Sequence, residues 1–256
     1  MEVRFLGAHN IESDACRMSG LLVDGVLALD AGSLTGSLSF AGQLGLKAVL
    51  LTHQHYDHCR DLPALGMNLY LHESSLDVYG AAVVKASLES NLLQTPLYPN
   101  FLERPLQAPA LRFNIIEAGQ AVEVAGYQVL SVAVRHGVPA TGYWVTAPDG
   151  KSLFYTSDTG PGLAETWRQV KPDLLVTELT APNRYEEFAR QTGHLTAALL
   201  REELVSFKAI NGYLPRVVLV HMNPLEEKTI AAEIAVIAAD LNAEIRLGHE
   251  GLRVAL

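Results

Sequence analysis

The sequence predicts an α/β fold in which two mixed β-sheets pack face to face between outer helices, a four-layer αββα sandwich. Apolar runs of strand length fall into two series separated by a helical stretch, and helices then alternate with strands. Several runs are apolar at every position, which is typical of strands buried on both faces. Two packed sheets with helices outside satisfy this order of elements.

Strands are expected where short apolar runs end at turn residues. They are predicted over residues 3–6, 20–23, 26–29, 48–51, 128–134, 152–155, 174–176 and 217–220. Asp24-Gly25 joins the second run to the third. This pair is a type I′ turn signal, so the two runs should form a hairpin.

Four stretches have helical spacing. They are predicted over residues 76–93, 162–170, 196–207 and 225–241. The last one follows Asn223-Pro224, a helix-entry signal. Segment 76–110 also holds four prolines after its helical part, so we expect a helical insert followed by an irregular loop that could roof a site. The prediction is one domain over residues 1–256 with this insert.

Composition limits the class of protein. The 256 residues are 49% hydrophobic and carry a net charge of −9, which suits a globular protein and argues against a nucleic-acid partner. No apolar stretch approaches the roughly 20 residues that a membrane span needs, and the first residues look like a strand rather than a signal peptide. We therefore expect a cytoplasmic protein with a small-molecule substrate, no membrane contact, and a homodimer by default. Cys16 and Cys59 are expected to be free and buried.

A run of potential metal ligands follows the predicted strand 48–51. It contains His53, His55, Asp57 and His58. In an extended segment residues two apart face the same side, and ligand sites in α/β sheets lie at the carboxyl ends of strands. Imidazole and carboxylate donors are those that Zn²⁺, Mn²⁺ and Fe²⁺ accept. The run therefore predicts a metal site.

Three more candidates occupy the same position relative to a strand. His136, Asp158 and His221 each follow directly after an apolar run. A lone histidine at such a place is more often structural. Three such residues at strand ends, complementing the first run, favour a shared centre.

The chain resembles the metallo-β-lactamase superfamily over residues 3–250. The resemblance is carried by the His-x-His-x-Asp-His run at 53–58 and by Asp30, His136, Asp158 and His221, which match the other motifs. It implies one metal ion held by His53, His55 and His136, and a second held by Asp57, His58 and His221. Asp158 would bridge the two ions, and Asp30 would orient the metal-binding loop through hydrogen bonds. Two divalent ions are expected, zinc first and manganese or iron as alternatives.

Such a centre predicts a hydrolase. Two metal ions can hold a bridging hydroxide as the nucleophile and stabilise the charge that develops on the attacked and leaving oxygens. The ligand set fixes hydrolysis but leaves the substrate open, because phosphodiesters, lactones, thioesters and amides all suit this chemistry.

His194 narrows the substrate. It lies in Gly193-His194-Leu195-Thr196, where a helix is expected to begin, and it could donate a proton to a leaving alkoxide or help to bind phosphate. This element, with Ser-Asp-Thr-Gly-Pro at 157–161 and His-x-x-Pro at 221–224, resembles class II cyclic-nucleotide phosphodiesterases and the related tRNA 3′-processing endonucleases. The predicted function is hydrolysis of a small phosphodiester, with a cyclic nucleotide as one candidate. Asp57, Asp158 and His194 are the predicted catalytic residues.

Alternatives remain at this stage. A lactone or thioester hydrolase would use the same metals, a tRNA 3′-processing-like endonuclease would act on RNA, and a metal-stabilised binding module would have no activity. The extended basic arm of the tRNA enzymes has no counterpart, since no Lys/Arg-rich insertion occurs here. Whether His9, His72 and His249 reach the site is open, and His72 is expected at a strand end. Tyr98 and Phe101 are candidates for stacking a base or closing a lid, with core packing as the default.

Overall fold

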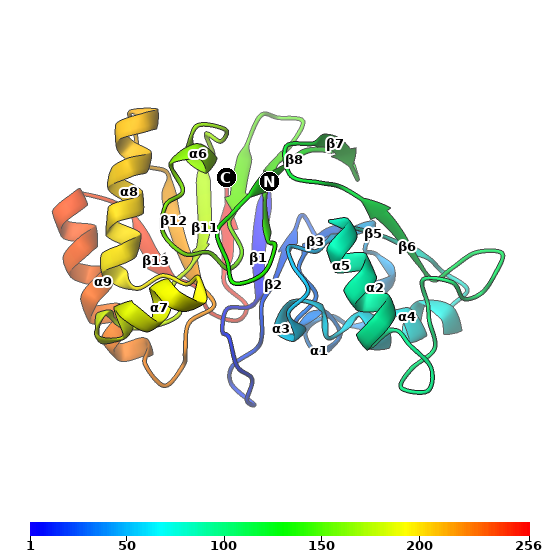
Figure 1. The fold of residues 1–256 in the computed structure, drawn as a ribbon. Helices are drawn as coiled ribbons and strands as arrows, with labels where there is room; N and C mark the ends of the chain where they lie inside the picture. Colours follow the sequence, from blue (N-terminus) through cyan, green and yellow to red (C-terminus); the bar gives the residue numbers. More distant parts are fainter.

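Fourteen strands form two sheets of seven in the computed structural model, which describes residues 1–256 (Figure 1). The first sheet has the order β14 (Arg253–Ala255), β1 (Glu2–Gly7), β2 (Gly20–Val23), β3 (Leu27–Leu29), β4 (Ala48–Leu50), β5 (Leu76–Gly80) and β6 (Leu111–Ile115). The second has the order β13 (Ile245–Leu247), β12 (Arg216–Val220), β11 (Leu174–Glu178), β10 (Ser152–Tyr155), β9 (Thr141–Thr146), β8 (Tyr127–Ala133) and β7 (Ala121–Val124). Both sheets mix parallel and antiparallel pairs, as predicted.

Helices cover the outer face of each sheet. In Figure 1 the helices α6 (Ala164–Trp167), α7 (Glu186–Thr192), α8 (Ala197–Asn211) and α9 (Glu227–Leu241) lie on the side of the second sheet. The helices α1 (Leu34–Ser37), α2 (Phe40–Leu44), α3 (Tyr56–Cys59), α4 (Leu62–Leu71) and α5 (Ala82–Ser87) lie on the side of the first. The αββα prediction is therefore confirmed. No helix combines the length and the apolar character that crossing a membrane requires.

Three clusters of buried apolar side chains fill the spaces between the four layers of helices and sheets. The cluster between the sheets draws on both of them, for example on Phe5 and Leu29 from the first and Tyr143 and Val176 from the second. The outer clusters lie under the helices and contain 21 and 20 buried residues. The strands β2, β3 and β4 are buried at every position because they are covered on both faces, which explains the uniform apolar runs in their sequences.

The predicted hairpin is present between β2 and β3. The two strands are antiparallel, with Leu22 opposite Ala28. Asp24 and Gly25 have φ of 47° and 75°, as a type I′ turn requires at both central positions.

The prediction of one helix over 76–93 is wrong at its start. Residues 76–80 form β5, which pairs in parallel with β4 and β6, and the helical part is α5 with a π-helical turn at Leu88–Leu92. Leu76, Val78 and Gly80 are buried while their neighbours are partly exposed, so the period is two, as in a strand. Burial between two strands overrides a local pattern that is ambiguous over so short a run.

The rest of the insert packs onto α4 and does not form a lid. Phe101 is 2% exposed, and a Cβ at Gly66 of α4 would lie 2.6 Å from its ring. The lid or base-stacking role considered for Phe101 is therefore wrong, and its default, core packing, holds. Tyr98 is half-buried with its ring centroid 6.0 Å from that of Phe101.

Candidate metal centre

The predicted ligands meet at one edge of the sandwich because each follows the carboxyl end of a strand. Asp30 follows β3, the run 53–58 follows β4, His136 follows β8, Asp158 follows β10 and His221 follows β12. Asp30 and His221 have φ of 63° and 60°, and Ser157 beside Asp158 has φ of 59°. Left-handed backbone at non-glycine residues is strained and tends to mark functional sites. Here it makes the sharp turns that send these side chains into a common space.

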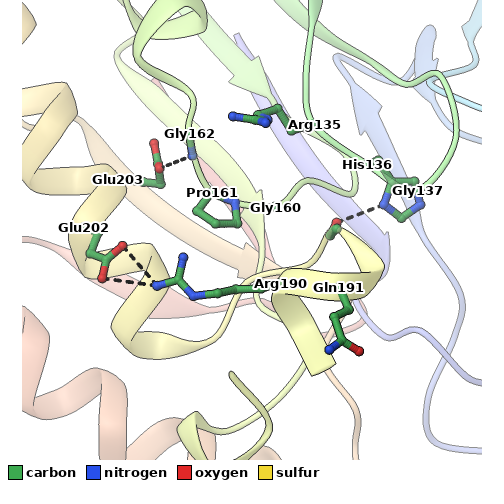
Figure 2. A pocket seen from close by; sticks show the side chains of 11 residues that line it. Arg135, His136, Gly137, Gly160, Pro161, Gly162, Arg190, Gln191, Glu202 and Glu203 are labelled. Atoms are coloured by element: carbon green, nitrogen blue, oxygen red, sulfur yellow. Dashed lines mark hydrogen bonds and ion pairs between the residues drawn. The ribbon is translucent and has the colours of Figure 1, made fainter. Parts of the chain in front are cut away.

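The first ligand group joins three rings and a carboxylate. His53 Nε2 lies 3.0 Å from His55 Nδ1, which lies 3.1 Å from His136 Nε2. Asp158 Oδ2 is 3.7 Å from His53 Nε2. His136 uses its other nitrogen, Nδ1, to donate to the carbonyl of Gly193 at 2.9 Å (Figure 2). Its Nε2 therefore offers a lone pair, as a metal ligand must.

Burial lowers the pKa of His53 well below its usual range, and the neighbouring His58 lowers it further. Burial also lowers the pKa of His55, with His136 adding to the effect. Both rings are neutral at pH 7 for these reasons. Three imidazoles whose nitrogen atoms converge on one point fit a divalent cation placed between them.

The second group contains Asp57, His58, Asp158 and His221. His221 Nε2 lies 3.1 Å from Asp57 Oδ2 and 3.3 Å from Asp158 Oδ2. His58 Nε2 and Asp158 Oδ1 are buried, 3.3 Å apart, and have no hydrogen-bond partner. Buried polar atoms left unpaired cost free energy, and a cation between them would satisfy both. The residues present therefore fit a metal ion here too, with Asp158 shared by both groups.

Asp30 is the buried anchor of the second group. Its carboxylate accepts hydrogen bonds from the Thr52 backbone N–H at 2.9 Å and from the Tyr155 hydroxyl at 3.0 Å. It also accepts from His58 Nδ1 at 2.7 Å. This contact fixes the tautomer of His58, so that Nε2 carries the lone pair that faces the cluster.

A third group stands beside these two, around the buried carboxylate of Glu178. This carboxylate accepts from His194 Nδ1 at 2.7 Å and from the Thr180 hydroxyl at 2.8 Å. Having donated its proton, the Thr180 oxygen accepts from His221 Nδ1 at 2.8 Å. Glu178 therefore orients His194 directly and His221 through Thr180.

Glu178 also controls the charge of His194. Burial acts to lower the pKa of His194, but the Glu178 carboxylate outweighs burial and raises it to about 9. His194 was predicted from its sequence motif, whereas Glu178 was not predicted as a site residue. The available signal was a carboxylate soon after the apolar run Leu174-Leu175-Val176, at the end of the strand β11, where all five residues are buried.

A model of the beta-lactamase superfamily domain matches residues 22–222 of this chain. The chain belongs to this superfamily. Ribonuclease Z of Thermococcus kodakarensis is 26% identical over 210 residues, which are 72% of this chain and 62% of that protein. The chain thus spans less than two thirds of that relative's length.

Two solved structures share the superfamily fold over the whole chain. The crystal structure of unliganded yeast PDE1 aligns with a TM-score of 0.87 at 15% identity, and covers 100% of this chain and 99% of its own. The short form of human tRNase Z aligns with a TM-score of 0.69 at 18% identity, with 100% and 99% covered. Family membership and the ligand groups together fit a site that binds metal ions.

The relatives alter one expectation about partners. The acidic composition argued against a nucleic-acid partner. The curated relatives of this chain, however, are named ribonuclease Z. Net charge alone is therefore no ground for excluding an RNA substrate.

A hollow of about 360 Å³ opens over both ligand groups. It is lined by Asn10, Met18, His55, Tyr56, Asp57, Asp158, His194 and His221. Tyr56 is 62% exposed at its rim. No residue of the 76–110 insert lines this hollow, so the insert does not roof it.

The three other histidines do not enter the ligand groups. His9 is buried and pairs with Glu250 through Nδ1 at 2.8 Å. His72 is exposed at the end of α4, so its prediction at a strand end is wrong, and His249 is exposed beside Glu250. Cys16 and Cys59 are both free, although only Cys59 is fully buried.

A second, larger hollow of about 640 Å³ lies behind His136 (Figure 2). Arg135, Arg190 and the loop Gly160–Gly162 line it together with Glu202 and Glu203. Arg190 pairs with Glu202, and Glu203 accepts from the backbone N–H of Gly162. The Glu203 contact connects the loop after Asp158 to α8, and the Arg190 contact connects α7 to α8; both are drawn in Figure 2.

Proposed function

We propose that this protein is a hydrolase that cleaves phosphodiesters and uses two divalent metal ions, zinc first, with manganese or iron as alternatives. His53, His55 and His136 would hold one ion, Asp57, His58 and His221 the other, and Asp158 would bridge them. When bound, the ions would make a nucleophile from water at neutral pH and neutralise charge on phosphoryl oxygens. The observation that carries the choice of phosphodiesters is the imidazole of His194, which Glu178 holds at 2.7 Å and which lies against a ring of each ligand group.

His194 is built to hold a proton at the rim of the cleft. Its Nδ1–H is bound by Glu178 at 2.7 Å, and its ring stacks on that of His221 with centroids 5.4 Å apart. Its Nε2–H is left free, because no hydrogen bond involves that atom. A positioned acid of this kind donates a proton to an alkoxide as the phosphorus–oxygen bond breaks, and its positive charge favours a phosphoryl oxygen.

The primary test is turnover of bis-(p-nitrophenyl) phosphate by the purified protein after loading with Zn²⁺ or Mn²⁺. Activity should disappear on chelation and return with the metal. Metal analysis should give two ions per chain. Stable metal binding with no hydrolysis of any phosphodiester would contradict the proposal and favour a non-enzymatic binding module.

A carboxylic substrate is the first alternative, since lactones and thioesters suit the same metals. Replacing His194 distinguishes a phosphodiester substrate from a thioester substrate. A diester with an alkoxide leaving group needs the proton, whereas a thiolate leaves without one. Hydrolysis of a lactone or thioester that exceeds diester hydrolysis in kcat/KM would overturn the choice of phosphodiesters. Only the thioester should be indifferent to His194→Ala, because a lactone also releases an alkoxide.

Among phosphodiesters we propose a small substrate, with a cyclic nucleotide as one candidate. The acidic chain and the 360 Å³ hollow suit a compact molecule. The second candidate is RNA, on the ground that the relatives are named ribonuclease Z. Parallel assays with a 3′,5′-cyclic nucleotide and with a tRNA precursor carrying a 3′ trailer decide between them.

A further inference from the structure

The loop at residues 159–163 follows Asp158 directly and leads into α6. We term it the Asp158 loop. Its position matters to both ligand groups, because Asp158 belongs to both. The loop also reaches a second proposed ligand, since the Gly160 N–H donates to the carbonyl of Arg135, the residue directly before His136. A shift of this backbone would therefore move Asp158 and disturb His136.

Two buried carboxylates hold the backbone of the Asp158 loop. At its start, Glu178 accepts a hydrogen bond from the Thr159 N–H at 2.9 Å. At its end, Glu203 of α8 accepts from the N–H groups of Gly162 at 2.6 Å and Leu163 at 3.1 Å. Figure 2 shows the contact between Glu203 and Gly162. Because both carboxylates bind backbone N–H groups, they fix the course of the chain itself.

The Glu203 carboxylate lies apart from the metal ligands. It belongs to neither ligand group, and it lines the hollow behind His136 instead of the hollow over the ligand groups. Glu203 is 5% exposed, and its third hydrogen bond comes from the Trp167 indole N–H at 2.9 Å. Burying a carboxylate costs free energy unless hydrogen bonds replace the lost water. Two of its three donors belong to the Asp158 loop, so any effect of Glu203 on the ligand groups passes through this loop.

We propose that Glu203 is a positioning residue, which holds the Asp158 loop so that Asp158 and His136 keep the geometry that binds metal ions. The inference rests on the proposed function, because it takes the ligand groups to be occupied by metal. Loss of the carboxylate would leave buried N–H groups unpaired, at a cost in free energy. The loop would shift to pair them elsewhere, and Asp158 would shift with it.

The test is Glu203→Gln, which keeps the size of the side chain but turns one acceptor oxygen into an N–H donor. It can no longer accept from Gly162 and from Leu163 with separate oxygens. The dissociation constant for Zn²⁺, measured by calorimetry, should rise about tenfold or more, as when other groups that orient ligands are removed. The visible absorption spectrum of the cobalt-loaded protein should change too, because it reports the arrangement of ligands around the ion.

Two variants are the controls. Glu202→Gln makes the same change at the neighbouring position, where the side chain is exposed and pairs with Arg190. It should leave both zinc affinity and the cobalt spectrum unchanged. Trp167→Phe removes the third donor to Glu203 and disturbs the buried core without freeing the loop. It should lower the melting temperature and keep the wild-type zinc affinity and cobalt spectrum.

Wild-type zinc affinity and an unchanged cobalt spectrum in Glu203→Gln would overturn the positioning role. An equal loss of zinc affinity in Trp167→Phe would overturn it as well, since general destabilisation would then explain both variants. Neither measurement depends on turnover. Failure of the proposed function is therefore seen separately, as zinc-bound wild-type protein that hydrolyses no phosphodiester.

Discussion

The carboxylate of Glu178 and the imidazole of His194 lie 2.7 Å apart, across 16 residues of sequence. Glu178 is fully buried and accepts four further hydrogen bonds, three of them from the backbone N–H groups of Thr159, Thr180 and Leu195. It is therefore rigid, and so is the ring that it holds. The Thr180 hydroxyl donates to Glu178 and accepts from His221. One buried carboxylate therefore orients both a proposed proton donor, His194, and a proposed metal ligand, His221.

We expect His194→Ala to reduce kcat by about 10²- to 10⁴-fold for a diester with an alkoxide leaving group, the usual contribution of a general acid. The loss should be much smaller for a p-nitrophenolate leaving group, which leaves without a proton. Steady-state kinetics on the two substrates measure the difference. His249→Ala, an exposed histidine outside the ligand groups, is the control. Equal losses on both substrates would indicate that His194 binds phosphate instead of donating a proton.

Asp158→Asn should lower the metal content of the purified protein from two ions per chain to one or none. Asp158 takes part in both ligand groups, and an amide supplies neither the charge nor the second oxygen donor of a carboxylate. Elemental analysis after dialysis measures the content. Asp149→Asn, an exposed carboxylate at a turn, should keep the full content. Retention of two ions by Asp158→Asn would contradict the bridging role.

Gly193→Ala should weaken metal binding by displacing His136. Gly193 has φ of +76°, and a Cβ there would lie 2.8 Å from the Cα of His136 and the backbone N of Gly137. The loss of stability from the left-handed backbone alone is about 1–2 kcal/mol. Isothermal titration with Zn²⁺ should give a dissociation constant raised about tenfold or more, the scale seen when groups that orient a ligand are disturbed.

The control variant Gly126→Ala separates the displacement of His136 from the cost of a left-handed backbone. Gly126 has φ of +88° and nothing within 4 Å of an added Cβ. It should lose only about 1–2 kcal/mol of stability, which the left-handed backbone costs, with unchanged zinc affinity. If both alanine variants lose zinc affinity equally, the effect comes from general destabilisation and not from the position of His136.

Glu250→Gln should lower stability at pH 7 by about 1.5–3 kcal/mol, the contribution of hydrogen bonds to a charged group. The ring of His9 and the backbone N–H of Arg17 hold the pKa of Glu250 below its usual range, against the opposing effect of burial. The ionised carboxylate therefore stabilises the folded state above the unfolded-state pKa of about 4.3. That stabilisation is lost as the pH falls through the lower folded-state pKa.

Urea unfolding at pH 7 and near pH 4, on metal-free protein of both forms, measures this difference. The gap between wild type and Glu250→Gln should be large at pH 7 and should narrow toward acid pH. Using metal-free protein removes the separate effect of acid on metal binding. A gap independent of pH would show that the carboxylate acts through packing alone.

The sequence by itself determined the fold class and the membership of the ligand groups. Apolar runs that give way abruptly to His and Asp reveal both a buried strand and the polar end where ligands gather, because a chain leaving a sheet exposes its next residues to one edge. His53, His55, Asp57 and His58 could be found this way, and so could His136, Asp158 and His221. Each signal is local, within about ten residues.

The tertiary structure decided what depends on pairing between distant segments. The pairing of Glu178 with His194 and the approach of Gly193 to His136 both follow from how separate loops pack. The tertiary structure also decided that residues 76–80 form a strand. Their own pattern was ambiguous, and pairing with β4 and β6 selected the extended conformation. Local spacing carries no information on which loop meets which, because that is set by strand order and by the two-sheet packing.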